Sequence, residues 1–167
     1  MPTNNLLITL LKEAVQKCYA NDFPLIERSM EQACVTRICI YMHELIQNDN
    51  SFSCLRGYNL DCEYNKNGDH IKETPRCPNG TRPDLILHKR GSNSSNLIIV
   101  EFKPRKAHYK KHIETGKYID EVKLEDFTNQ GIYNYQIGVW VKLHKRKPTY
   151  TYYKNGTILS EREVCNE

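Results

Sequence analysis

The chain has 167 residues, of which 39% are apolar and 26% charged, and its formal net charge is +4. This length suits one domain with its own hydrophobic core, and the aromatic content excludes a chain that is disordered throughout. The sequence contains no apolar stretch near the roughly 18 residues of a membrane span and no basic leader typical of a signal peptide. We therefore expect a single cytoplasmic domain over residues 1–167.

The seven cysteines form no C-x-x-C pair, and the six histidines are scattered along the chain. These spacings disfavour a zinc site, a redox motif and a disulfide framework. Reduced thiols in the cytoplasm are the expectation. Residues 51–167 carry a net charge of +6, whereas residues 1–50 carry −2, so the basic part of the chain suits a polyanionic partner.

Two helices are predicted first. Apolar residues at helical spacing predict an amphipathic helix over residues 4–20. Asp22 is a candidate N-cap and Pro24 fits a first turn, so a second helix is expected from residue 24 to about residue 47. Glu27 and Glu31 should then lie one turn apart at the edge of its apolar stripe.

After residue 55 the apolar period changes from 3.6 to 2, which indicates strands. We expect strands at 60–64, 83–88, 97–103 and 133–143, a helix at 120–128, and a last, edge strand at 149–154. Residues 65–69 and 71–82 are expected to be a turn and a loop. This order predicts an α/β or α+β fold, with a mixed sheet of four to five strands flanked by helices and an extra N-terminal helix.

Charged residues end the otherwise apolar strand 97–103. Glu101 and Lys103 are two apart and share one face of the sheet, with Phe102 on the other. An antiparallel hairpin with strand 83–88 would set Asp84 beside both. Buried charges at this point require pairing or a metal ion. Mg²⁺ or Mn²⁺ is the expected cofactor, held by the Asp84 and Glu101 carboxylates and the Phe102 carbonyl, because hard cations prefer oxygen ligands.

Pro83-Asp84 followed by Glu101-Phe102-Lys103 resembles the PD-(D/E)XK nuclease superfamily, which has the restriction-endonuclease-like fold. Residues 60–66 together with Arg82-Pro83-Asp84 also resemble a group of uncharacterised small bacterial members. The resemblance implies a core of helix, three-stranded antiparallel meander, helix and strand. It implies that Asp84 and Glu101 bind the metal and that Lys103 is the catalytic lysine.

Many members of the superfamily add an acidic residue from the helix before the sheet. Glu31 is the first choice for it here, Glu27 the second, and Glu63 on the first strand is a further alternative. The competing structural interpretation of the motif is an ion pair of Lys103 with Glu101 or Asp84 at the end of a strand.

Two basic segments suit a phosphate backbone. The candidates for nucleic-acid binding are Arg105, Lys106, Lys110, Lys111, Lys145 and Arg146. Exposed basic loops without a ligand are the alternative.

The sequence thus predicts a metal-dependent nuclease whose expected substrate is DNA, with sequence specificity supplied by homodimerisation, loops or a partner protein. The alternatives are a catalytically inactive domain that binds nucleic acid or protein, and a structural protein with incidental basic loops.

Overall fold

The computed structural model describes residues 1–160 and 163, so Cys165 lies outside the described residues. The helices are α1 (Asn4–Asn21), α2 (Phe23–Glu27), α3 (Glu31–Asn48), the 3-10 helix η1 (Asn50–Leu55) and α4 (Ile119–Thr128). The strands are β1 (Asn59–Cys62), β2 (Lys66–Asn67), β3 (His70–Ile71), β4 (Leu85–His88), β5 (Ile98–Pro104), β6 (Ile137–Leu143), β7 (Thr149–Lys154) and β8 (Thr157–Leu159).

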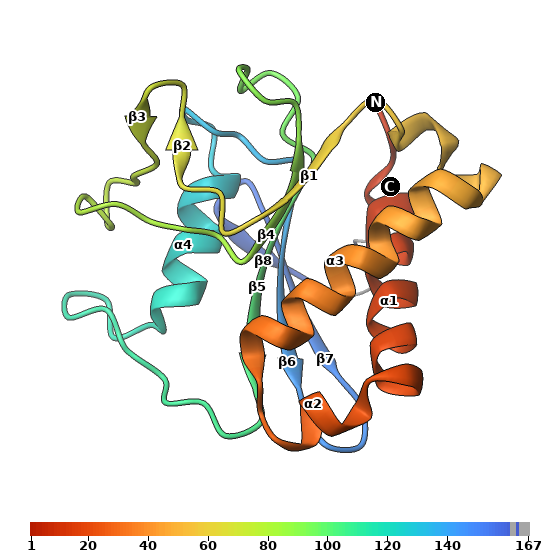
Figure 1. Ribbon diagram of the computed structural model, residues 1–167. Coiled ribbons are helices and arrows are strands. Elements are labelled where there is room, and N and C mark those ends of the chain that lie inside the picture. Colours follow the sequence, from red (N-terminus) through yellow and green to blue (C-terminus); the bar gives the residue numbers. More distant parts are fainter. Residues whose placement is uncertain (161–162, 164–167) are drawn as a thin grey trace.

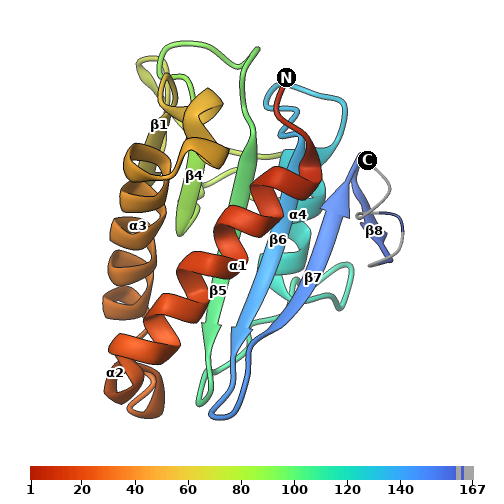
Figure 2. The same cartoon turned by 90° about the vertical axis from the view of Figure 1, so that its right-hand side faces the viewer.

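Six strands form one mixed sheet in the order β1-β4-β5-β6-β7-β8, and β2 and β3 pair separately. Figure 2 shows β4 to β8 side by side behind α1. β5 and β6 are parallel, and the other neighbours in the large sheet are antiparallel. The predicted mixed sheet with flanking helices and an N-terminal helix is confirmed, but it has six strands and not four to five. The order of helix, antiparallel meander (β1, β4, β5), helix and strand is also confirmed.

The helices form two layers around the sheet, with α1 and α3 on one face and α4 on the other (Figure 1). The alternation of side chains in β5 divides its residues between the two layers. Val100 and Phe102 belong to the core beneath α1 and α3, and Ile99 belongs to the smaller core beneath α4. Glu101 and Lys103 therefore share one face, as the sequence predicts, and that face is the one that α4 covers.

The single helix predicted from residue 24 to 47 is wrong, because the chain breaks it between α2 and α3. Ser29 has a left-handed backbone with φ of 59°, and the Met30 N–H donates to the Leu25 carbonyl at 2.9 Å. Glu27 and Glu31 therefore lie on different helices. Asp22 makes no side-chain cap to α2, because its carboxylate binds Arg37 and the Tyr41 hydroxyl.

The predictions for β6 and β7 also change. Strand β6 begins at Ile137, and Asn134 with φ of 46° turns the chain just before it. Tyr133 and Tyr135 are buried beneath α4, but they do not belong to the strand. β7 is not an edge strand, because β8 pairs with it. None of the described helices combines the length and apolar character that crossing a membrane requires.

Candidate functional site

The antiparallel pairing of β4 with β5 brings Asp84 to Glu101. Leu85 lies opposite Val100, so one further step along the two strands sets Asp84 opposite Glu101. The Phe102 N–H donates to Asp84 Oδ2 at 2.7 Å. Burial raises the pKa of Asp84 to about 6, because the hydrogen bond from Phe102 offsets only part of the cost of desolvating the charge.

Glu101 is the most deeply buried acid of the site, with 1% of its surface exposed. Its Oε2 accepts a hydrogen bond from Lys123 Nζ at 3.0 Å. Its Oε1 is buried and has no hydrogen-bond partner among the described residues. Burial and the neighbouring charge of Asp84 raise the pKa of Glu101 well above its ordinary value, against the attraction of Lys123. A second cation near Oε1 would relieve this cost.

Lys103 pairs with acids that lie outside its own hairpin. Its Nζ lies 2.9 Å from Asp120 Oδ2 and 3.9 Å from Glu31 Oε2. Burial alone would lower the pKa of Lys103, but the Asp120 and Glu31 carboxylates raise it on balance, so the amine is a cation at neutral pH. Among the described residues, the expected ion pairs of Lys103 with Glu101 or Asp84 do not form, and Lys123 takes the place of Lys103 beside Glu101.

The structure separates the three candidates for the additional acid. Glu31 begins α3 beside Lys103, and burial raises the pKa of its carboxyl group. Glu27 is exposed and pairs with Lys145 at 2.8 Å. Glu63 pairs with Arg82. Of the three, Glu31 lies nearest the lysine of the motif.

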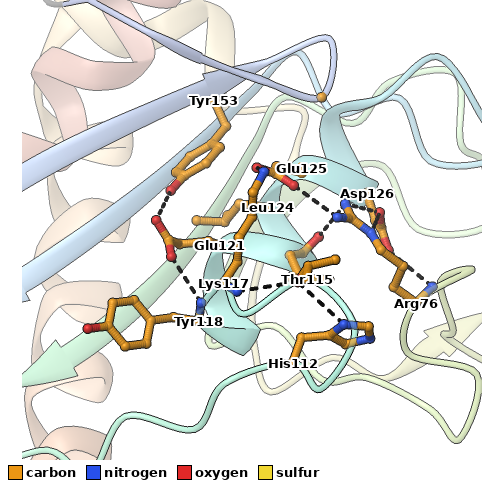
Figure 3. Close-up of polar contacts among 12 residues, drawn as sticks. Arg76, His112, Thr115, Lys117, Tyr118, Glu121, Leu124, Glu125, Asp126 and Tyr153 are labelled. Carbon is orange, nitrogen blue, oxygen red and sulfur yellow. Dashed lines mark hydrogen bonds and ion pairs between the residues drawn. The ribbon is translucent and has the colours of Figure 1, made fainter.

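Asp120 and Lys123 were not predicted as site residues from the sequence, although they stand three apart on the predicted helix and so share one of its faces. Their position depends on how α4 is held. Arg76, from the loop after β3, donates to Asp126 Oδ1 at 2.7 Å and to Glu125 Oε2 at 3.0 Å. Figure 3 shows Arg76 beside Glu125 and Asp126 of α4. These contacts fix the helix with Asp120 and Lys123 turned toward β5.

On the same helix, the Glu121 carboxylate accepts the Tyr118 backbone N–H at 3.0 Å (Figure 3). This contact satisfies a free N–H at the start of α4. The Lys117 ammonium donates to Glu125 Oε1 at 2.6 Å and ties the preceding loop to the helix. The first turn of α4, which carries Asp120, is thereby anchored from both sides.

We name the six converging side chains the Glu101 cluster. It consists of Glu31, Asp84, Glu101, Lys103, Asp120 and Lys123, which interact through the ion pairs and charges given above. The cluster holds four acids and two cations, so negative charge is in excess. In the described part of the chain, no three His, Cys, Asp or Glu side chains stand close enough to hold a metal ion as they are.

The residues present nevertheless suit a hard divalent cation. The donors are carboxylate oxygens, and Glu101 Oε1 is a buried acceptor that lacks a partner among the described residues. The pKa of Asp84 and that of Glu101 are raised mainly by burial. The charge of Glu31 raises the pKa of Asp84 further, and the charges of Asp84 and Asp120 raise that of Glu101. Asp84 and Glu101 are therefore the residues that would hold such an ion, as the motif predicts.

A pocket of about 290 Å³ opens onto the cluster and is lined by Lys103, His108, Lys110, Asp120 and Lys123, with Ile119. The predicted basic residues are all exposed and follow the ends of two parallel strands: Arg105, Lys106, Lys110 and Lys111 come after β5, and Lys145 and Arg146 come after β6. Pro104 pairs with Leu143 at the ends of these strands, so both basic segments start from the same edge of the sheet.

No protein-family model matches the chain, and the comparison with curated proteins also finds no match. The resemblance to the PD-(D/E)XK nucleases therefore rests on the motif residues and the order of the elements.

Proposed function

We propose that the protein is a metal-dependent nuclease of the PD-(D/E)XK type that hydrolyses phosphodiester bonds in DNA. The observation that carries the proposal is the burial of Glu101 beside Asp84, with Lys103 on the same face of the sheet and no hydrogen bond to Glu101 Oε1 from the described residues. A purely structural ion pair of Glu101 with Lys123 does not require Asp84 as a second acid beside it, because desolvating a second carboxylate costs free energy.

In this proposal Asp84 and Glu101 hold the divalent cation. Such an ion, when bound, stabilises charge on the phosphate and lowers the pKa of a bound water. Lys103 faces the pocket as an ammonium group and stabilises the anionic phosphate. Asp120 positions the Lys103 amine through their 2.9 Å ion pair, and Lys123 holds the Glu101 carboxylate in place.

The exposed lysines and arginines after β5 and β6 would bind the DNA backbone on either side of the pocket. We propose that the protein acts in the cytoplasm, where the six described free cysteines would remain reduced. Sequence specificity in such a small domain would come from homodimerisation or a partner protein.

One observation favours a second candidate, an inactive domain that binds nucleic acid. Lys123 and Lys103 already occupy carboxylates of the Glu101 cluster with ion pairs at 3.0 and 2.9 Å. A network of this kind holds α4 on the sheet without any ion. The basic loops would then bind DNA without cleaving it.

Supercoiled plasmid, single-stranded DNA and RNA would be incubated with the protein in Mg²⁺, in Mn²⁺ and in EDTA. We expect cleavage of DNA only with metal, and a loss of at least 100-fold in Glu101→Gln and Lys103→Met. Asp69→Asn, at an exposed turn outside the cluster, is the matched control and should cleave normally. Absence of cleavage of every substrate by the wild-type protein would reject the proposal, and salt-dependent gel shifts would then support the binding domain.

A further inference from the structure

A second pocket, of about 200 Å³, lies between the β2–β3 hairpin and the loop that joins β4 to β5. Figure 1 shows these two segments at the same end of the molecule. Its lining includes Tyr64, Lys66, Lys72, His88, Lys89 and Ser92, and none of the described residues that line it is Asp or Glu. The pocket therefore gathers positive charge without a carboxylate of its own.

Lys72 is the central group of this pocket. Only 3% of its surface is exposed, and its Nζ donates to the Tyr135 hydroxyl at 3.1 Å. Within the described residues its ammonium has no ion pair, because the nearby Asp61 is already bound by His88 and Arg90. Burial lowers the pKa of Lys72 to about 8, so the amine is still largely protonated at pH 7.

Four aromatic rings surround the Lys72 amine, with their centroids 5.4 to 5.7 Å from Nζ. Cation–π attraction replaces part of the lost hydration, but the rings carry no net charge. An ammonium group has three donors, and the one hydrogen bond to Tyr135 leaves two for a ligand. A buried cation with free donors in a carboxylate-free pocket is suited to an anion.

The rim of the pocket is held in place. Asn93 Nδ2 donates to Asn67 Oδ1 at 2.9 Å and ties the two loops together. His88, which is 4% exposed, is oriented by its 2.9 Å contact with Asp61 Oδ2. Lys66 and Lys89 are exposed at the mouth. The cavity is therefore preorganised, with one buried cation inside and two exposed cations at its entrance.

We propose that this pocket binds a phosphoryl group, with Lys72 as the buried cation and Lys66 and Lys89 at the rim. It is a different site from the Glu101 cluster: Asp84 and His88 stand four residues apart along the β4 segment, which is about 13 Å at 3.3 Å per residue. The proposal does not depend on nuclease activity, since the ligand is recognised by its charge alone. The phosphoryl group belongs either to a small phosphate compound or to the end of a nucleic acid.

Calorimetric titrations in EDTA would compare inorganic phosphate with an oligonucleotide that carries, or lacks, a terminal phosphate. Saturable binding of phosphate alone identifies a small ligand, whereas tighter binding of the phosphorylated oligonucleotide identifies a nucleic-acid end. Lys72→Met keeps the apolar stem within the aromatic rings and should weaken binding at least tenfold. The Lys66→Gln/Lys89→Gln double variant changes only exposed positions and tests the rim if Lys72→Met does not fold.

Two controls separate this site from the rest of the molecule. Lys147→Ala removes an exposed lysine elsewhere and should bind phosphate as the wild type does. Asp84→Asn changes the Glu101 cluster and should also leave phosphate binding unchanged. The proposal is overturned if the wild type binds neither inorganic phosphate nor the phosphorylated oligonucleotide saturably, or if the folded pocket variants bind these two ligands as tightly as the wild type.

Discussion

Replacement of Asp84 by Asn should stabilise the metal-free protein at neutral pH. Asp84 is held close to Glu101 in a site that disfavours its charged form, and burial raises its pKa to about 6. The amide of Asn can still accept the hydrogen bond from the Phe102 N–H but carries no charge. The variant therefore keeps the contact and loses the electrostatic cost.

The size of the effect follows from the shift. The pKa rises from 3.8 to about 6, a difference of about two units, and each unit corresponds to about 1.36 kcal/mol, so the cost at pH 8 is about 3 kcal/mol. Because the folded protein binds the Asp84 proton more tightly than the unfolded chain does, protonation of Asp84 stabilises the fold, and this stabilisation is complete below about pH 4. That stability is lost as the pH rises through about 6.

Urea unfolding of the two proteins in EDTA, from pH 4.5 to pH 8, measures the difference. We expect Asp84→Asn to exceed the wild type by up to about 3 kcal/mol at pH 8 and to converge with it toward pH 4. Asp69→Asn, at an exposed turn, should show no such trend. A gain that is absent at pH 8, or that does not change with pH, would refute the reasoning, and the same variant should lose metal-dependent cleavage.

Three further predictions concern the support of the site. Lys123→Met should lower the free energy of unfolding in urea at pH 7 by about 3 kcal/mol, because it leaves Glu101 buried without its cation. Adding Glu101→Gln should restore most of this loss, and an unchanged urea midpoint in Lys123→Met would contradict the role of the pair. Gly138→Ala should lower the free energy of unfolding by roughly 1–3 kcal/mol, since a Cβ there would lie 3.0 Å from Thr128 Cγ2. Stability equal to that of the wild type would show that α4 shifts to accommodate the methyl group. Lys110→Ala should reduce the salt slope of DNA binding by about 1 in anisotropy titrations, and an identical slope would exclude Lys110 from the interface.

The fold was largely predictable because the strongest hydrophobic patterns in the sequence define its main helices and strands. The apolar run before Glu101 places β5 at the centre of the sheet, and the helical spacing of the first 20 residues defines α1. The break between α2 and α3 was not predictable, since Ser29 adopts a left-handed backbone without being glycine. Strand β8 is only three residues long and carries too little periodicity to be recognised.

The candidate site was half predictable. Asp84, Glu101 and Lys103 belong to one hairpin, so the period of the strands is enough to bring them together. Asp120 and Lys123 arrive on α4, and their approach to β5 depends on how that helix docks. Sequence spacing relates them to each other but contains no signal that relates them to Glu101.

The route of the chain through the site has a consequence for how the protein opens. The acids Asp84 and Glu101 lie on a local hairpin, whereas Lys123 lies on the crossover that joins the parallel strands β5 and β6. If the crossover lifts away while the hairpin stays folded, water reaches Glu101, and the pKa of its carboxyl group, which burial raises, falls toward its ordinary value. Detachment of the crossover is therefore a proton-releasing event, and alkaline conditions should promote it before the sheet itself comes apart.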